Sequence, residues 1–371
     1  MDATQARIIV VAGALVPPGW LAPAAVSDRL PRLARLGLHA EAEALPTEPR
    51  ALPMELAHDR WLRQRLVAEP IAPGAMTAVR RLAPHGAGLA GWLAEPVHFH
   101  LGRDHALLAA GAMRDLSEAE ATELAGAIAP ILAEDELEAT LLDARTWLLR
   151  QRGAPGEESA LRLQAASPDA AAGRSIAGYL PEGPDARRYR RLLTGIQMTW
   201  HEHPVNARRE ARGALPVNGI WLSGPVSPRA LAAWRTQLAE GQASLDETLL
   251  EPRLRDDRDA WLEGLAALES RLLRILDSRS GQVLLCGDAE ARWLRVGRPG
   301  VAARAGTIAR QVAGSLRSLL GRGGSPADTA QAHTSQADTP QAAAAAGRAA
   351  DPLAAVFTES GRADHGRAVH A

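Results

Sequence analysis

The 371-residue sequence predicts an α/β fold of α+β character, in which helices flank a mixed or antiparallel sheet. Hydrophobic residues make up 46% of the chain, a share typical of a globular protein with a large core. Short apolar runs typical of strands alternate with longer runs that have helical periodicity. We therefore expect one large α/β unit over residues 1–320. From residue 321 onward large apolar side chains are scarce, which predicts a disordered, low-complexity tail over 321–371.

The N-terminal part of this unit, residues 1–90, begins with an apolar run that predicts a buried strand over residues 8–11. Pro17 and Pro18 end the apolar stretch, so it is too short for a signal peptide or a membrane-spanning helix. The remainder, from residue 16 to residue 90, is rich in Pro, Ala and Arg. Its leucines have helical spacing and predict short helices joined by proline turns.

The second part, residues 91–320, begins with a strand, strand, helix, strand, strand pattern, which predicts an antiparallel sheet with a helix on one side. The helix is the best-marked element, because Ser117 and Glu120 have the spacing of a capping box. Further helices are predicted from apolar spacing at residues 184–203, 261–276 and 301–320. The expected strands span residues 96–101, 105–109, 139–142, 146–149, 219–222 and 283–286.

Charge and cysteine content exclude several classes of protein. The sequence contains no lysine, so all 42 positive charges are arginine, and a Walker A loop or a Schiff-base site is excluded. The 43 acidic residues balance the arginines, which leaves no basic footprint for nucleic acid. Cys286 is the single cysteine, so no internal disulfide or zinc ribbon can form. We expect a cytoplasmic protein without a membrane span.

A first candidate cluster of polar residues lies in the segment EPVHFHLGRDH, residues 95–105. On a strand, the period of two places His98 and His100 on one face, a geometry that metal ligands use. The same alternation places Val97, Phe99 and Leu101 in the core and leaves the histidines in a structural or substrate-facing role. No cysteine partner and no HExxH motif is present, so no metal site is predicted. The candidate residues are His98, His100, Arg103, Asp104 and His105.

A second candidate cluster lies between residues 200 and 224, where three arginines separate two copies of the tripeptide Pro-Val-Asn. Arg208 and Arg212 are four residues apart and share a helical face, so their guanidinium groups could hold a phosphate or a carboxylate. Pairing with Glu202 and Glu210 explains them equally well. The candidate anion-binding residues are His201, His203, Asn206, Arg208, Arg209, Arg212 and Asn218.

The two asparagines of this cluster also have a simpler interpretation. Asparagine is common at turns and helix caps, because its short side chain bonds to nearby backbone groups. Asn206 is then a cap on the next helical turn. Asn218 marks the entry to the strand expected at 219–222.

The two clusters together resemble the RpfE-type regulatory proteins of proteobacteria, whose members often carry the label phosphoglycerate mutase. The resemblance covers roughly residues 8–296 and is specific in these two blocks. The second block is also similar to a segment of the archaeal-type cofactor-independent phosphoglycerate mutases, which are metalloenzymes of the alkaline phosphatase superfamily. Pro225 departs from the glycine-rich ending usual there. The matching positions are His203, Pro204, Asn206, Arg209, Gly213, Asn218 and Gly224.

The mutases resembled here use a phosphorylatable serine and two metal ions, whose ligands begin with an Asp-Gly pair after the first strand. In this sequence no acid occurs between Asp2 and Asp28, so two-metal phosphoryl transfer lacks a ligand. The resemblance therefore implies a regulatory protein without an intact phosphotransfer site, which binds a small phosphorylated or carboxylate metabolite.

Two alternatives to this reading are a mutase-like, metal-dependent phosphotransferase and a structural or partner-binding protein. No cofactor is predicted, and a divalent metal belongs only to the enzymatic alternative. A small anionic metabolite is the expected partner. The sequence points to no nucleic acid, and it identifies no protein partner.

Overall fold

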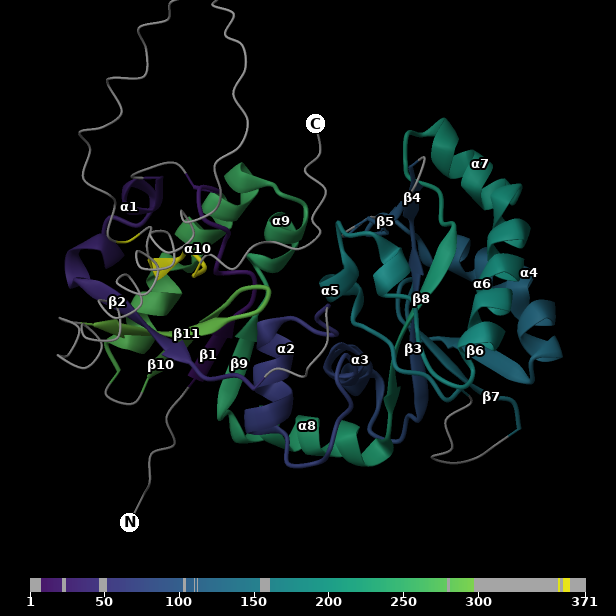
Figure 1. The fold of residues 1–371 in the computed structure, drawn as a ribbon, viewed down its shortest axis with the longest axis horizontal. Coiled ribbons are helices and arrows are strands. Elements are labelled where there is room, and N and C mark those ends of the chain that lie inside the picture. Colours follow the sequence, from purple (N-terminus) through teal and green to yellow (C-terminus); the bar gives the residue numbers. More distant parts are fainter. Residues whose placement is uncertain are drawn as a thin grey trace, which may run out of the picture.

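The computed structural model describes residues 8–21, 25–46, 52–102, 105–109, 111, 113–153, 161–278, 281–296, 353 and 356–360. In this part of the chain the strands form a five-stranded sheet, a four-stranded sheet and a two-stranded ribbon. Figure 1 shows the two larger sheets in separate halves of the molecule, with helices between and around them. The predicted α/β class, with mixed and antiparallel sheets, is confirmed.

The five-stranded sheet has the order β2-β11-β10-β1-β9. Its centre is β1 (Ile8–Val11), an apolar strand that pairs in parallel with β10 (Gln282–Cys286) and β9 (Ala243–Asp246). Two antiparallel strands, β11 (Ala291–Val296) and β2 (Leu38–Glu43), extend it beyond β10. The strands expected at 8–11 and 283–286 are therefore confirmed.

Helices cover both faces of this sheet. They are α1 (Ala25–Arg29), the 3-10 helix η1 (Leu33–Leu36) and α10 (Arg258–Leu276) on one face, and α2 (Ala57–Trp61), the π-helical turn η2 (Leu62–Leu66) and α8 (Pro228–Glu240) on the other. Successive residues of a strand point to opposite faces. Accordingly, Ile9 and Val11 pack with α1 and α10, whereas Val10 packs with α2 and α8.

The four-stranded sheet is fully antiparallel, with the order β6-β7-β3-β8. Its strands are β3 (Gly91–Val97), β6 (Leu137–Leu141), β7 (Trp147–Gln151) and β8 (Gly219–Val226). The predicted antiparallel sheet is confirmed for β6 and β7. Its first two strands differ from the prediction, because residues 99–101 and 106–108 form a separate ribbon and β3, which begins at Gly91, pairs with β7 instead. β8 extends the sheet at its edge.

The outer face of the four-stranded sheet is covered by α4 (Glu118–Glu134) and α6 (Ala186–His201). The predicted capping box begins α4: Ser117 Oγ accepts a hydrogen bond from Glu120 N at 3.3 Å, and the Glu120 carboxylate accepts one from Ser117 N at 3.0 Å. On the inner face, α3 (Met76–Leu82) lies between the two sheets (Figure 1). The buried apolar side chains of α3 pack in one cluster with residues of both sheets.

Short elements complete the fold. They are β4 (Phe99–Leu101), β5 (Ala106–Leu108), α5 (Pro168–Ala171), α7 (Pro204–Ala211), α9 (Leu250–Leu254), η3 (Ala83–His85) and η4 (Ile176–Gly178). β4 and β5 form the two-stranded ribbon, separate from the larger sheet. For this reason the expectation that Leu101 is buried is wrong, and its exposed fraction is 77%. No helix in the described ranges is long and apolar enough to span a membrane.

The expectation of helices throughout residues 16–90 is wrong at β2. Its sequence, LHAEAE, contains residues that helices tolerate well, and it lies at the edge of the sheet. Pairing along β11 determines the strand conformation, because each β2 residue from Leu38 to Glu43 lies opposite a β11 residue. Tertiary pairing overrides the local preference here.

The expectation that residues 321–371 take no part in the core is wrong for residues 353 and 356–360, which the structure describes. Leu353, Val356 and Phe357 are buried with α1 and α10, and the Phe357 ring meets Trp261 edge-on at 6.2 Å. Full burial contributes about 1.5–3 kcal/mol for each of these three side chains, which together is comparable with the cost of ordering so short a segment. The predicted helix at 301–320 and the rest of the tail lie outside the described residues.

Candidate functional site

A cavity of about 400 Å³ lies between β3 of the four-stranded sheet and the segment that follows β9 of the five-stranded sheet. Its walls come from α3, β3, the turn between β6 and β7, α5 and α9, which are far apart in the sequence. The charged side chains that line it are Arg81, His85, Glu95, Arg114, Asp143, Arg145, Asp169, Glu247 and Glu251.

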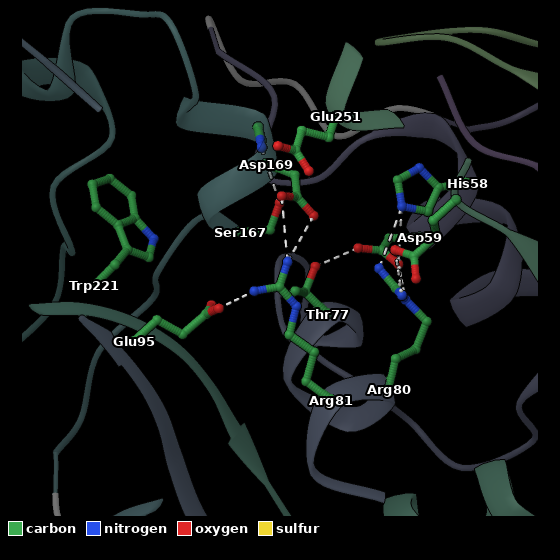
Figure 2. A network of polar contacts seen from close by, with 12 residues as sticks. His58, Asp59, Thr77, Arg80, Arg81, Glu95, Ser167, Asp169, Trp221 and Glu251 are labelled. Atoms are coloured by element: carbon green, nitrogen blue, oxygen red, sulfur yellow. Dashed lines mark hydrogen bonds and ion pairs between the residues drawn. The ribbon is translucent and has the colours of Figure 1, made fainter. Parts of the chain in front are cut away.

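Arg81 is the cation at the centre of the polar network in Figure 2. It projects from α3, and its guanidinium group contacts the Glu95 carboxylate of β3. Its Nη2 atom also lies 3.4 Å from Oδ2 of Asp169, which α5 carries. α5 forms at this point because Ser167 caps it and Pro168 occupies its first position. Two carboxylates for one guanidinium group leave this network with a net negative charge.

Glu95 is the unusual member of the network. Its exposed fraction is 8%, and its Oε2 atom has no hydrogen-bond partner among the described residues. A buried polar atom without a partner costs about 1–3 kcal/mol. Glu95 also lines the cavity, which makes its carboxyl group a candidate acceptor for an N–H or O–H group of a bound molecule.

On the other side of α3, Arg80 holds a second network, which joins the buried His58 and Asp59 (Figure 2) to the exposed side chain of Glu247. Its Nε atom lies 2.7 Å from Oδ1 of Asp59, and its Nη1 atom lies 2.9 Å from Oε1 of Glu247. Burial opposes ionisation of Asp59, but Arg80 and His58 outweigh it and lower the pKa of Asp59 to about 2. This network therefore stays charged near neutral pH, and it fixes Glu247 at the cavity wall.

The rest of the lining makes the cavity acidic. Glu251 of α9 pairs with Arg114 and Arg255. Gly111 has a φ of +60°, and a side chain at this position would collide with the Glu251 carboxylate. In all, the lining contains five carboxylate side chains and three arginines. The cavity therefore suits a ligand that brings hydrogen-bond donors or positive charge.

The arginines predicted to bind an anion lie elsewhere, at α7 beside the start of α4. The buried Arg209 contacts Asp115 at 2.8 Å and Glu120 at 3.3 Å. Arg212 contacts Glu120 at 2.8 Å, and the exposed Arg208 contacts Glu123 at 2.7 Å. The arginines therefore form ion pairs with Asp115, Glu120 and Glu123, and not with the expected partners Glu202 and Glu210.

These ion pairs leave the anion-binding role of the arginines a prediction. Burial opposes ionisation of Glu120, but hydrogen bonds from Arg212 and Ser117 lower its pKa to about 2. The Glu120 carboxylate is thus committed to the arginines over the whole physiological pH range. A free anion at this place would compete with an acid that the chain already supplies.

The asparagines of the same block fasten neighbouring elements together. Asn206 is buried inside α7, so the expectation that it caps a helix is wrong, and His203 takes that role by accepting from Val205 N at 3.2 Å. The Asn206 side chain donates to Trp200 O and Val217 O, at 2.7 and 2.8 Å. Asn218, before β8, donates to Phe99 O at 3.0 Å and accepts from Phe99 N at 2.7 Å.

The histidine cluster meets the arginine block in space, as neither sequence pattern could show. His98 is buried, its Nδ1 atom lies 2.7 Å from Pro216 O, and its ring centroid lies 4.6 Å from that of His100. Burial lowers the pKa of His98, so it favours the neutral ring. His201 and His105 are exposed. Arg103 and Asp104 lie outside the described residues.

None of the described candidate residues of the two clusters lines the cavity, although Glu95, at the start of the first segment, does. The sequence pattern did not identify the cavity's other charged residues. Within the described ranges, no three His, Cys, Asp or Glu side chains are placed to hold a metal ion. One signal was available: Glu95 is a charged residue within GWLAEPV, which is buried along its whole length. A carboxylate in such a run indicates a partner or a site.

Comparison with known proteins gives little further information. No protein-family model and no curated protein matches the sequence. A solved structure of a cofactor-independent phosphoglycerate mutase from Thermoplasma acidophilum DSM 1728 aligns with 78% of this chain and 90% of its own, at 15% identity and a TM-score of 0.26. The PH0037 protein from Pyrococcus horikoshii aligns over 79% and 88%, at 12% identity and a TM-score of 0.36. These scores are too low to carry an argument about the site.

Proposed function

We propose that this protein is an RpfE-type regulatory protein that binds a small carboxylate metabolite bearing an amine or hydroxyl group, in the cavity between the two sheets. The observation that carries the proposal is the buried Oε2 atom of Glu95, which lacks a partner among the described residues at the cavity wall. A hydrogen bond from an ammonium or hydroxyl group to this charged acceptor is worth about 1.5–3 kcal/mol. A volume of about 400 Å³ is ample for such a metabolite.

The charges of the lining favour a carboxylate over a phosphate ester. Arg145 offers a guanidinium group at the cavity, which suits a single carboxylate, whereas Arg114 already pairs with Glu251. The five acids of the lining repel a ligand with two or more negative charges. Of the two ligand classes that the sequence suggests, we therefore favour the carboxylate. The metal-dependent phosphotransferase remains the alternative.

Titration with L-serine, glycerate and 3-phosphoglycerate tests this proposal, with calorimetry and thermal unfolding as readouts. Serine or glycerate is expected to bind the wild type more tightly than 3-phosphoglycerate does. Glu95→Gln removes the charge of the acceptor and should weaken binding by at least about tenfold, which corresponds to about 1.4 kcal/mol.

The matched control is Glu138→Gln, because Glu138 is also a sheet carboxylate paired with an arginine, Arg150, but lies outside the cavity lining. This variant should bind like the wild type. The proposal fails when neither serine nor glycerate binds the wild type, or when the two variants weaken binding equally.

A further inference from the structure

The C-terminal segment, residues 353 and 356–360, lies beyond the carboxyl ends of β1 and β10. Val16 N donates to Phe357 O at 2.9 Å, and Glu359 N donates to Val16 O at 2.7 Å. The Glu359 carboxylate accepts a hydrogen bond from Asp288 N at 2.8 Å, two residues after β10. In open α/β sheets, ligands bind outside the carboxyl ends of the parallel strands. Here a side chain of the protein itself occupies that place.

The absence of a side chain at Gly287 leaves space for the Glu359 carboxylate. A Cβ atom at position 287 would collide with Oε1 of Glu359 and would lie 2.9 Å from Leu15 Cβ. Only glycine allows the carboxylate to approach the backbone so closely and to reach the N–H group of Asp288. The backbone here has the form of a cradle for an oxyanion.

Arg253 supplies the positive charge beside the cradle. Its exposed fraction is 1%, and its Nη2 atom lies 3.3 Å from Oδ2 of Asp288, an oxygen that Arg174 also contacts at 2.9 Å. The Nε and Nη1 atoms of Arg253 have no hydrogen-bond partner within the described part of the chain. Two buried guanidinium groups thus share one carboxylate. Arg253 also attracts the negative charge of Glu359, although burial and Asp288 oppose that charge more strongly.

We propose that Gly287, the N–H group of Asp288 and the Arg253 guanidinium group form a carboxylate-binding site. Glu359 occupies this site in the structure, and a free carboxylate occupies it when the C-terminal segment is released. Asp288 and Glu290 lie near the Glu359 carboxylate and raise its electrostatic energy. The site therefore favours a singly charged carboxylate over phosphate. This site is separate from the cavity between the sheets and does not depend on the function proposed for it.

Chemical rescue of Glu359→Ala in the full-length protein tests the site. The variant leaves a gap of the size of a carboxylate, so acetate should raise its melting temperature by at least about 2 °C relative to chloride at equal ionic strength. Acetate should change the melting temperatures of the wild type and Glu359→Gln by much less, because in both a side chain fills the site until the segment opens. Acetamide should have no effect on any of them.

Arg253→Gln in the Glu359→Ala background should abolish the response to acetate, whereas Arg295→Gln, which removes a pair with Glu41 at the other end of the sheet, should preserve it. The proposal is overturned if acetate acts equally on the wild type and Glu359→Ala, or if it acts on neither. A stronger response to phosphate than to acetate would also overturn it.

A measurement on the wild type covers the case in which Glu359→Ala does not fold. Acetate that competes for the site should accelerate amide hydrogen exchange in residues 356–360 and leave exchange in α8 unchanged, since α8 does not touch the site. Equal rates in acetate and chloride would count against the proposal.

Discussion

Among individual residues, Arg209 shows why a cluster of charged residues in a sequence does not by itself indicate a binding site. It belongs to the block that suggests an anion site, yet its side chain is fully buried and contacts Asp115, Glu120 and the carbonyl oxygen of Leu215. Sequence spacing identified a cluster of arginines correctly. It could not show that their partners lie about 90 residues earlier, at the start of α4.

Replacing Arg209 should therefore test stability and not binding. Arg209→Met leaves Glu120 with Arg212 and Ser117, but it removes the donor to the Leu215 carbonyl oxygen, so it is expected to cost about 1–3 kcal/mol in the free energy of unfolding. Arg208→Met is the matched control on the same helix, because its pair with Glu123 is exposed and worth at most about 1 kcal/mol. Urea unfolding of both variants measures this loss of free energy of unfolding. Equal losses would show that the burial of Arg209 has no energetic consequence.

At the scale of secondary-structure elements, the sequence predicts those whose pattern is local. The apolar run of β1 and the capping box of α4 are recognisable without any knowledge of the fold. By contrast, β2 and the five-residue helix α9 depend on tertiary contacts, and they have no distinctive local signal. The cavity was beyond prediction for the same reason, since it is formed by short elements from both sheets.

Docking of the C-terminal segment should depend on pH through Glu359. Burial and the nearby Asp288 raise the pKa of Glu359 to about 7, with a smaller contribution of the same sign from Glu290 and an opposing one from Arg253. A carboxyl group whose pKa is raised on folding stabilises the folded form below the unfolded pKa of about 4.5, and this stabilisation is lost as pH rises through 7.

Hydrogen exchange at residues 356–360 measures this dependence. After correction for intrinsic rates, opening of the segment should increase by at least about tenfold between pH 5 and pH 8. Glu359→Gln should show a flat profile, because glutamine does not titrate. If the wild-type profile were as flat as that of the variant, titration of Glu359 would not be the cause of the pH dependence.

For the whole molecule, the C-terminal segment changes the expectation for truncation. From composition alone, removal of residues 321–371 would leave stability unchanged. Because Leu353, Val356 and Phe357 are buried, we instead expect deletion after Leu320 to lower the melting temperature by several degrees, at about 1.5–3 kcal/mol for each large side chain. Deletion after Ser360, which keeps the segment, should retain the wild-type value. Calorimetry of both truncations distinguishes a docked segment from a dispensable one.

The short helix α9 contributes a charged residue to each of the two proposed sites. Glu251 lines the cavity, and Arg253 lies beside the carboxylate site that Glu359 occupies. A helix of five residues moves as one body, so a displacement that alters one set of contacts alters the other. Thermodynamic reciprocity then applies: if a molecule in the cavity changes the affinity of the segment by some factor, the segment changes the affinity of that molecule by the same factor. Measuring either affinity with and without the other partner would give the coupling free energy of both.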